Sequence, residues 1–403
     1  MDSRVEIFSP PAGKVNILCF TAFYLPGNKS GGPVRSISAL ASKLKANFIF
    51  NIFTSDRDIN DSESYKDIEL RNWSLIKENR IYYSSNSLNS YIDLVDVLNE
   101  NTFEILYLNS FFNFKFGILP VILSKLKKNK SFKILLAPRG EFSEGAFKLG
   151  NFKKIIFVLF AKLFRLYDDI FWHASSNYEA DDIKNILTNS IDENKILIAP
   201  DLTNFTFDDS NFYCNNELQM NPFKICFISR ISPKKNLLFA LSVLSQVEED
   251  VSFDIYGPIE DHKYWEKCMK LIDKIPSNIQ IAYKGIIEHD KINFTFSKYN
   301  LFFFPTLGEN FGHVIIESLC AGTPVLISNN TPWRNLKSSG VGWDLDLNDV
   351  VGYINAIQSI INMNINDYLL LRENVKKFGL TNVNDLSIID ANLKMFQLLL
   401  NEN

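Results

Sequence analysis

The sequence lacks several features that mark specialised classes of protein. Its five cysteines are scattered, odd in number and nowhere spaced as C-x-x-C, which disfavours a zinc knuckle or a thioredoxin-type motif and predicts buried, reduced thiols in a cytoplasmic protein. No run reaches the roughly 18 apolar residues of a membrane-spanning helix, and no apolar segment follows a basic start as in a signal peptide. The charges nearly balance, with 42 Lys and Arg against 46 Asp and Glu, so the dominant positive field of a nucleic-acid-binding protein is absent.

What the sequence does contain is typical of a folded protein with more than one domain. A length of 403 residues favours two or three domains. With 46% apolar and 22% charged residues, the chain is neither disordered nor collagen-like nor a coiled coil. Aromatic residues are abundant, since Phe, Tyr and Trp make up 13% of the chain.

Short apolar runs alternate with segments of helical periodicity, which predicts two α/β domains built on parallel sheets. In the first half, strands are expected at 14–24, 48–55, 103–110, 132–140, 169–176 and 195–204. In the second half, they are expected at 223–229, 252–257, 279–285, 300–306 and 323–328. Residues 203–222 lose this periodicity and are interpreted as a linker. Ligands of such sheets bind beyond the carboxyl ends of the strands.

The densest group of candidate functional residues lies in the segment 302–328. After a predicted strand, a loop carries Glu309, and a helix is expected to begin near Gly312 and to stop at Gly322. Free backbone N–H groups at the start of this helix, near Gly312 and His313, combine with the helix dipole to favour a phosphate.

Glu309 and Glu317 are eight residues apart, which corresponds to about 12 Å along a helix. The two carboxylates of a glycosidase lie about 5 to 9.5 Å apart, so this pair does not fit around one glycosidic bond. The spacing suits the two ends of an elongated ligand with phosphates between them, such as a nucleoside diphosphate sugar, because carboxylates accept hydrogen bonds from vicinal hydroxyls. The alternative is that both are solvated or ion-paired surface groups.

Two cations stand at the carboxyl end of the predicted strand 223–229. Arg230 and Lys235 lie in a short loop before a helix, with no acid nearby in the sequence. Arginine can bridge two phosphate oxygens and lysine adds a point charge, so this pair suits a diphosphate whose negative charge grows as it leaves. The alternative is a solvated basic turn.

The first half offers weaker candidates at the ends of its strands. Gly31 and Gly32 allow close approach of a ligand to backbone, although the loop is not G-x-G-x-x-G and could be only a tight turn. Arg139 and Glu141 follow the fourth predicted strand, where a ligand-facing residue is expected. His173 ends the next strand, and a lone histidine there is more often a core or capping residue than a catalyst.

The first half also carries a possible metal motif. Asp56 and Asp58 follow a strand like the metal-binding D-x-D of another class of nucleotide-sugar enzyme. No other carboxylate or histidine cluster has metal-ligand spacing, so we interpret both as loop acids and predict no metal site.

Residues 125–165 form a strongly basic stretch. Eleven Lys and Arg against Glu141 and Glu144 give this stretch a local charge of +9. Its second half places large apolar residues between cations, which is compatible either with an interfacial helix on anionic lipid or with an ordinary helix whose apolar face joins the core.

Over nearly the whole chain, these motifs resemble the GT-B glycosyltransferases of family 4, also called group 1 glycosyltransferases. The segment from Glu309 to Glu317 matches the E-x7-E motif of that family, and SRISPKKN resembles its phosphate loop, with Ser229 where glycine is usual. SGGPVRS resembles its N-terminal glycine loop, and HASSNYE resembles its helix-entry motif. Many members have a His-Gly pair where this chain has Pro138, Arg139, Gly140 and Glu141, so the group that meets the reacting sugar is not identified.

The resemblance implies two Rossmann-like domains that face each other across a cleft: 1–204 on the acceptor side and 205–382 on the donor side. A final helix at 383–403 would cross back to the first domain. The resemblance implies transfer of a sugar from a UDP- or GDP-linked donor with retention at the anomeric carbon, without a bound metal or other cofactor.

Site residues are carried over by the same resemblance. Glu317 would hold the ribose and Glu309 the hydroxyls of the sugar, while Arg230 and Lys235 would hold the diphosphate. The remaining donor contacts would come from Asn310, Phe311, Gly312, His313, Gly257, Lys284, Gly285 and Ile286. The acceptor and phosphate side would be lined by Gly31, Gly32, Arg139, Glu141 and His173.

The sequence therefore predicts a retaining glycosyltransferase that acts on a glycan or lipid-linked acceptor in surface polysaccharide biosynthesis. It is expected in the cytoplasm, with a possible peripheral contact with the membrane and none with nucleic acid. Alternatives are a GT-B nucleotide-sugar epimerase, a phosphorylase, for which no pyridoxal-binding lysine is identified, and a non-catalytic glycan-binding subunit.

Overall fold

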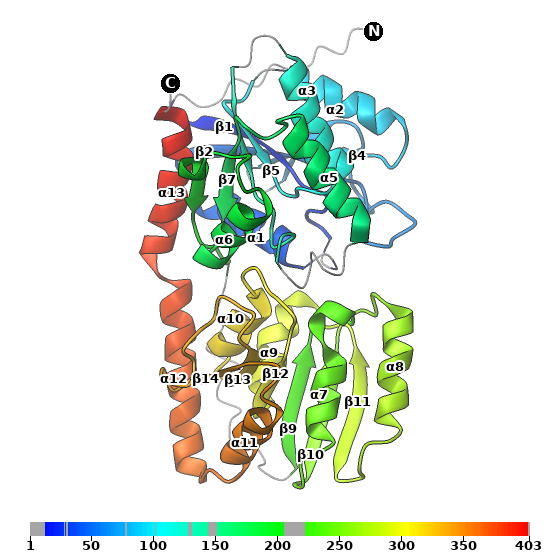
Figure 1. Ribbon diagram of the computed structural model, residues 1–403, viewed down its shortest axis with the longest axis vertical. Helices are drawn as coiled ribbons and strands as arrows, with labels where there is room; N and C mark the ends of the chain where they lie inside the picture. Colours follow the sequence, from blue (N-terminus) through cyan, green and yellow to red (C-terminus); the bar gives the residue numbers. More distant parts are fainter. Residues whose placement is uncertain are drawn as a thin grey trace. The chain divides into compact units, whose positions relative to one another are not determined.

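The computed structural model describes residues 13–27, 29, 31–76, 79–100, 102–127, 131–143, 151–204 and 222–401. The chain forms two compact units (Figure 1). Unit 1 contains Met1–Phe142, Gly150–Asn204 and Leu386–Asn403, and unit 2 contains Ser143–Leu149 and Phe205–Asp385. The chain thus passes from unit 1 to unit 2 after Asn204 and returns to unit 1 at Leu386.

The described part of unit 1 contains an eight-stranded sheet in the order β3-β4-β2-β1-β5-β6-β7-β8. Its strands are β1 (Val15–Phe20), β2 (Phe48–Ser55), β3 (Trp73–Ile76), β4 (Asn79–Ser84), β5 (Ile105–Leu108), β6 (Lys133–Leu136), β7 (Phe171–Ala174) and β8 (Ile196–Ile198). The pairing of β3 with β4 is antiparallel, and the other neighbours pair in parallel. The near-continuous burial of β1, β2 and β5 is typical of parallel strands covered on both faces.

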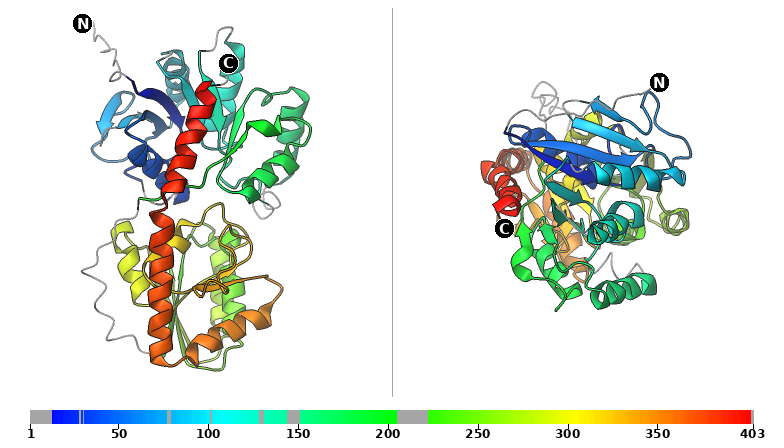
Figure 2. Two further views of the ribbon diagram at one scale, coloured as in Figure 1. Left: turned by 90° about the vertical axis from the view of Figure 1, so that its left-hand side faces the viewer. Right: turned by 90° about the horizontal axis from the view of Figure 1, so that it is seen from above.

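Helices cover this sheet and follow its strands in the βαβ pattern. They are α1 (Gly32–Lys43), α2 (Asn89–Asn99), a π-helical turn (Phe114–Ile118), α3 (Leu119–Leu126), α5 (Asn151–Leu163), α6 (Asn177–Ile186), a 3-10 turn (Glu193–Lys195) and α13 (Leu386–Asn401). In Figures 1 and 2, α13, in red, lies alongside the strands of unit 1.

The return of α13 to unit 1 is secured by aromatic packing. Phe396 contacts Phe48 and Phe50 of β2 and Tyr107 of β5, with ring centroids 5.2, 6.0 and 5.7 Å apart. Side chains of α1, including Ile37, belong to the same buried cluster. Alternate residues of β2 therefore face α1 and α13, and much of the aromatic content of unit 1 is core.

The described part of unit 2 contains a six-stranded parallel sheet in the order β11-β10-β9-β12-β13-β14. Its strands are β9 (Phe223–Ile228), β10 (Val251–Tyr256), β11 (Ile279–Gly285), β12 (Leu301–Phe304), β13 (Val325–Ser328) and β14 (Gly342–Leu345). Its helices are a 3-10 turn (Pro233–Lys235), α7 (Leu237–Leu244), α8 (His262–Ile272), a 3-10 turn (His289–Lys291), α9 (Ile292–Ser297), α10 (His313–Cys320), α11 (Val350–Ile361) and α12 (Ile365–Val383).

The strand orders locate the topological switch point of each sheet. In unit 1 the order reverses between β1 and β5, and in unit 2 between β9 and β12. Ligands of open α/β sheets bind in the crevice beyond the carboxyl ends of the strands at such a point. In unit 2, those two strands lead directly into Arg230 and into the loop of Glu309.

The predicted α/β class is confirmed, and so is the helix between Gly312 and Gly322. Two parts of the described sheets were not predicted. The β3–β4 hairpin lies in a stretch with charged residues between its apolar positions, and β14 is a short edge strand of four residues. Most of the predicted linker 203–222 lies outside the described residues.

Candidate functional site

The end of β9 and the end of β12 are joined by backbone and side-chain hydrogen bonds. The amide of Leu307 donates to the carbonyl of Lys234 over 2.8 Å, and the side chain of Asn236 donates to the carbonyl of Pro305 over 3.0 Å. Asn236 has φ 60° and ends the 3-10 turn that precedes α7, a backbone conformation that asparagine tolerates better than most residues. The two motifs predicted from the sequence therefore form one structure at the switch point.

Lys235 and Glu309 form an ion pair at the centre of this structure. Lys235 Nζ contacts Glu309 Oε1, and both side chains are nearly buried, with 12% and 13% of their surfaces exposed. Thr306 Oγ1 lies 3.2 Å from the same carboxylate oxygen, and Lys235 Nζ lies 5.5 Å from the centroid of the Phe304 ring. Burial alone would raise the pKa of Glu309, but Lys235 and Lys234 outweigh it and hold that pKa below its usual range. Glu309 is therefore ionised, and its side chain is held by Lys235 and Thr306.

Arg230 is paired more loosely. Its Nη1 lies 2.6 Å from Glu260 Oε1, and both side chains are about a third exposed. Glu260 follows β10 and is 30 residues away along the chain, so no local signal predicted this partner. Arg230 thus stands at the switch point with one carboxylate beside it.

The start of α10 has the geometry of an anion-binding helix terminus. Gly312 is its N-cap and has φ 80°, and a Cβ there would lie 2.8 Å from Cδ1 of Ile315. The carbonyl of Phe311 accepts a hydrogen bond of 2.6 Å from Trp333 Nε1, and the Phe311 ring packs on His313. The turn at Gly312 therefore leads directly into the first residues of α10, and backbone N–H groups at such a helix start, together with the helix dipole, favour an anion.

The other donor-side residues predicted in unit 2 lie in α10, at the end of β10, and in or just after β11. Glu317 lies within α10 and is buried, as is His313 at its start. Gly257 has φ 129°, and a Cβ there would overlap the carbonyl oxygen of Ser229, so glycine permits the close approach of the ends of β9 and β10. Lys284 lies in β11, 3.6 Å from Asp254.

Two of these predicted residues, Gly285 and Ile286, lie at the end of β11. Gly285 has φ 79°, and its carbonyl accepts a hydrogen bond of 2.8 Å from the amide of Gly257. Ile286 is exposed. Asn310 lies between Glu309 and the N-cap of α10 and is partly buried.

In unit 1, the predicted residues lie at the carboxyl edge of the sheet but point in different directions. Gly31 is the N-cap of α1, with φ 72°, and Gly32 is its first residue. Glu141 instead fixes the loop after β5, because it accepts hydrogen bonds from Ser110 Oγ and from the amide of Phe111, both over 2.6 Å. Burial raises the pKa of Glu141.

Arg139 and His173 lie inside unit 1, where their side chains contact other protein groups. Arg139 is paired with Asp201, and its side chain is 7% exposed. His173 Nδ1 lies 2.7 Å from the hydroxyl of Tyr107, and Nε2 lies 2.8 Å from the carbonyl oxygen of Ala199. In this geometry both side chains position other groups, and neither faces solvent.

Asp56 and Asp58 also serve the loop in which they lie. Asp56 is paired with Arg57 over 2.8 Å, and Asp58 accepts from the amides of Lys29 and Ile59. Within the described ranges, no group of three or more His, Cys, Asp or Glu is placed to hold a metal ion.

One surface of unit 1 is exposed and apolar. The α5 apolar face consists of Phe152, Ile155, Ile156, Leu159, Phe160, Leu163 and the following Phe164. The exposed fraction of these side chains runs from 48% for Ile155 to 77% for Leu163. In the part of the chain that is described, no helix is long and apolar enough to cross a membrane.

Comparisons with known proteins agree with this architecture. Residues 213–378 match the family model Glycosyl transferases group 1. A relative named as an uncharacterized 41.2 kDa protein in the cps region of Klebsiella pneumoniae is 24% identical over 257 residues, which are 62% of this chain and 67% of the relative.

Solved structures share the fold along nearly the whole chain. Sucrose-phosphate synthase from Thermosynechococcus elongatus has a TM-score of 0.70 at 16% identity, covering 96% of this chain and 98% of its own. HepE of Anabaena in complex with UDP-glucose has a TM-score of 0.68 at 14% identity, covering 96% and 100%. WaaG, a glycosyltransferase involved in lipopolysaccharide biosynthesis, has a TM-score of 0.65 at 13% identity, covering 94% and 99%. The match of residues 213–378 shows that most of unit 2 is similar to group 1 glycosyltransferases, and the solved structures show that the chain as a whole has the GT-B fold.

Proposed function

We propose that the protein is a retaining, metal-independent and cofactor-independent transferase that moves a sugar from a UDP- or GDP-linked donor to a glycan or glycolipid acceptor in the cytoplasm. The observation that carries this proposal is the joined pair of loops at the switch point of unit 2, with Lys235, Glu309 and the start of α10 in one rigid structure. HepE structures solved with UDP and with UDP-glucose support this donor class. The cps-region relative and WaaG support a role in capsule, O-antigen or lipopolysaccharide biosynthesis.

The charges at this site suit a leaving diphosphate. Lys235 has three N–H donors, so it can contact Glu309 and a phosphate oxygen together. Arg230 and the first N–H groups of α10 add further donors, and such preorganised donors stabilise negative charge as it develops. Glu309 would accept from hydroxyls of the sugar, and Glu317 from the ribose. Asn310, Phe311, His313, Gly257, Lys284, Gly285 and Ile286 would complete the donor site.

The reaction that we propose is a front-face displacement. The bond between the anomeric carbon and the β-phosphate oxygen breaks, and the acceptor oxygen bonds to the same face of that carbon. The acceptor hydroxyl passes its proton to an oxygen of the leaving diphosphate. Arg230 and Lys235 would stabilise the diphosphate during this step, which leaves the configuration of the sugar unchanged.

Arg230→Ala tests the donor site. Removing one preorganised donor to a transition-state charge costs about 2–4 kcal/mol, so turnover should fall at least about tenfold. The matched control is Lys274→Ala, because Lys274 is an exposed cation just after α8, at the amino edge of the sheet. Thermal-shift titration with UDP, GDP and their sugars should identify one stabilising nucleotide, which Lys274→Ala leaves unchanged.

The same experiments separate the alternatives. Turnover of Arg230→Ala equal to that of the wild type would refute the phosphate assignment. No response to any nucleotide would favour a non-catalytic glycan-binding subunit. Isomerised nucleotide sugar without transfer would indicate an epimerase, and sugar phosphate formed from a glycan and inorganic phosphate would indicate a phosphorylase. Activity abolished by EDTA and restored by a divalent cation would contradict metal independence.

We further propose that the α5 apolar face contacts an anionic membrane surface. The segment between Glu144 and Asp168 contains no acid, and Lys153, Lys162 and Arg165 lie among its apolar residues. An amphipathic helix of this kind gains free energy from apolar burial and from attraction to anionic headgroups. Such a contact would bring a lipid-linked acceptor to unit 1.

Sedimentation with phosphatidylglycerol vesicles tests the membrane contact. Leu159→Glu and Leu163→Glu should each reduce vesicle binding several-fold. The control is Leu88→Glu, which changes a leucine of unit 1 outside α5 that is more exposed than either of these two. Binding that is equal for all three variants, or equal for phosphatidylcholine vesicles, would contradict this proposal.

A further inference from the structure

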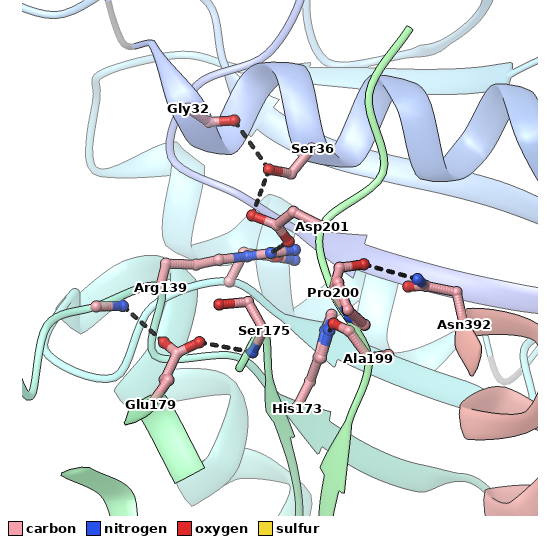
Figure 3. A network of polar contacts seen from close by, with 12 residues as sticks. Gly32, Ser36, Arg139, His173, Ser175, Glu179, Ala199, Pro200, Asp201 and Asn392 are labelled. Atoms are coloured by element: carbon pink, nitrogen blue, oxygen red, sulfur yellow. Dashed lines mark hydrogen bonds and ion pairs between the residues drawn. The ribbon is translucent and has the colours of Figure 1, made fainter. Parts of the chain in front are cut away.

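A buried network of polar contacts crosses the carboxyl edge of unit 1 (Figure 3). It is centred on Arg139, which follows β6. Arg139 Nε lies 3.0 Å from Asn109 Oδ1, Nη2 lies 2.6 Å from the hydroxyl of Tyr107, and Nη1 pairs with Asp201 Oδ1. All three nitrogens of the guanidinium are therefore used inside the unit.

One branch of the network reaches the start of α1. Asp201 Oδ2 accepts from Ser36 Oγ over 2.8 Å, and the same hydroxyl lies 3.1 Å from the carbonyl oxygen of Gly32 (Figure 3). Ser36 and Asp201 are both nearly fully buried. The carboxylate of Asp201 thus links Arg139 to the first turn of α1, where Gly31 and Gly32 lie.

A second branch fixes the turn that contains Arg139. Arg139 has φ 55° and Gly140 has φ 73°, so two consecutive residues adopt left-handed backbone conformations. For a residue other than glycine, this backbone conformation is unfavourable. Glu179, near the start of α6, accepts from the amide of Gly140 over 2.7 Å and from the amide of Ser175 over 2.8 Å (Figure 3). These contacts hold the turn in place.

A third contact ties the network to the C-terminal helix. Asn392 of α13 donates to the carbonyl of Pro200 over 2.8 Å. Pro200 and Asp201 belong to the last stretch of unit 1 before the chain enters unit 2, and α13 is the element that follows its return. This segment is therefore held by α13 at Pro200 and by Arg139 and Ser36 at Asp201.

We propose that Arg139 is a positioning residue of the transferase, which fixes the Gly31–Gly32 turn through Asp201 and the 138–140 turn through its own backbone. This inference rests on the proposed function, because both turns lie at the sheet edge where the acceptor side is expected. Arg139 acts here through a planar fork that joins three partners at once. Lysine cannot reproduce this geometry, because its ammonium is a point charge.

Arg139→Lys tests the contact between Arg139 and Asp201, and Ser36→Ala tests the contact between Asp201 and Ser36. Arg71→Lys is the matched control, because Arg71 also has positive φ, 58°, and also pairs with a buried carboxylate of unit 1, Asp93. In hydrogen–deuterium exchange, amides of α1 should exchange at least about tenfold faster in Arg139→Lys and in Ser36→Ala. Arg71→Lys should leave α1 unchanged, even where it lowers the melting temperature.

A kinetic measurement completes the test. With the nucleotide sugar that stabilises the wild type, Arg139→Lys should lower kcat for release of nucleotide at least about tenfold. It should keep the Kd for the free nucleotide within twofold, because the donor site lies on unit 2. Unchanged exchange of α1 in both variants would refute the coupling. Faster exchange with unchanged kcat would refute a role in the reaction. No turnover by the wild type would count against the proposed function, while the exchange data would still decide the coupling.

Discussion

His173 makes the stability of unit 1 depend on pH. The carbonyl oxygen of Ala199 can only accept, so Nε2 of His173 carries a proton and donates to it over 2.8 Å. Nδ1 therefore accepts a hydrogen bond from the hydroxyl of Tyr107, 2.7 Å away. The oxygen of that hydroxyl in turn accepts a hydrogen bond from Arg139 Nη2. A second proton on the imidazole would have no acceptor in this chain of contacts, so the neutral form fits the folded state.

The magnitude follows from the pKa. Burial, reinforced by the positive charge of Arg139, lowers the pKa of His173 from 6.5 to about 4. The unfolded chain thus binds a proton more readily than the folded chain between these two values, and stability falls as the pH drops through them. Full protonation of the unfolded state against a neutral folded state corresponds to a loss of about 2.5 kcal/mol between pH 7.5 and pH 4.5.

His173→Gln removes this titration while keeping a polar side chain. We expect the variant to be less stable than the wild type at pH 7.5 and the difference to narrow by about 2.5 kcal/mol at pH 4.5. Native-state hydrogen exchange of β1 and β5 measures this difference, because intrinsic exchange rates cancel between two proteins at one pH. Other titrating groups are common to both proteins and also cancel. A stability difference that is the same at both pH values would refute the neutral, buried assignment of His173.

Three further outcomes are expected from the packing. Phe396→Ala should destabilise unit 1 by about 3–5 kcal/mol, measured by hydrogen exchange of β2, because it leaves a cavity against Phe48. Gly312→Ala should destabilise unit 2 by about 1–2 kcal/mol and weaken nucleotide affinity in calorimetry, because φ is 80° there and the new Cβ would meet Ile315. Ser176→Ala should cost about 1 kcal/mol in urea unfolding, because its side chain caps α6.

Local sequence signals were sufficient to predict the strands, loops and helix that carry the candidate site residues of unit 2. A buried strand, a short loop and a helix that begins at a glycine all depend on neighbouring residues, so the ends of β9 and β12 could be predicted with their cations and carboxylates. The strand order, which makes these two strands neighbours at the switch point, could not be read from local pattern. The resemblance to a known family assigned residues of both loops to one donor site without giving the strand order.

The pairing partners could not be predicted, because they come from distant parts of the chain. Lys235 and Glu309 are 74 residues apart, and Arg139 and Asp201 are 62 residues apart. Arg139 follows a strand, as a ligand-binding residue would, but whether its side chain turns inward depends on Asp201. Arg139 and Gly140 both have left-handed backbone conformations, and the glycine was the one local sign of this turn in the sequence.

The ion pairs of unit 2 also distinguish Arg230 from Lys235, two cations that the sequence assigned to the same diphosphate. The pair of Arg230 with Glu260 is about a third exposed, and pairs of that kind contribute at most about 1 kcal/mol. Arg230 can therefore exchange its carboxylate for a phosphate at little cost. Lys235 is almost enclosed, and breaking a buried pair by removing one partner costs about 3–5 kcal/mol. In the donor site that we propose, Lys235 would therefore bind phosphate without leaving Glu309 and would keep the loop of Glu309 beside the diphosphate, while Arg230 would move to the phosphate oxygens as negative charge develops on them.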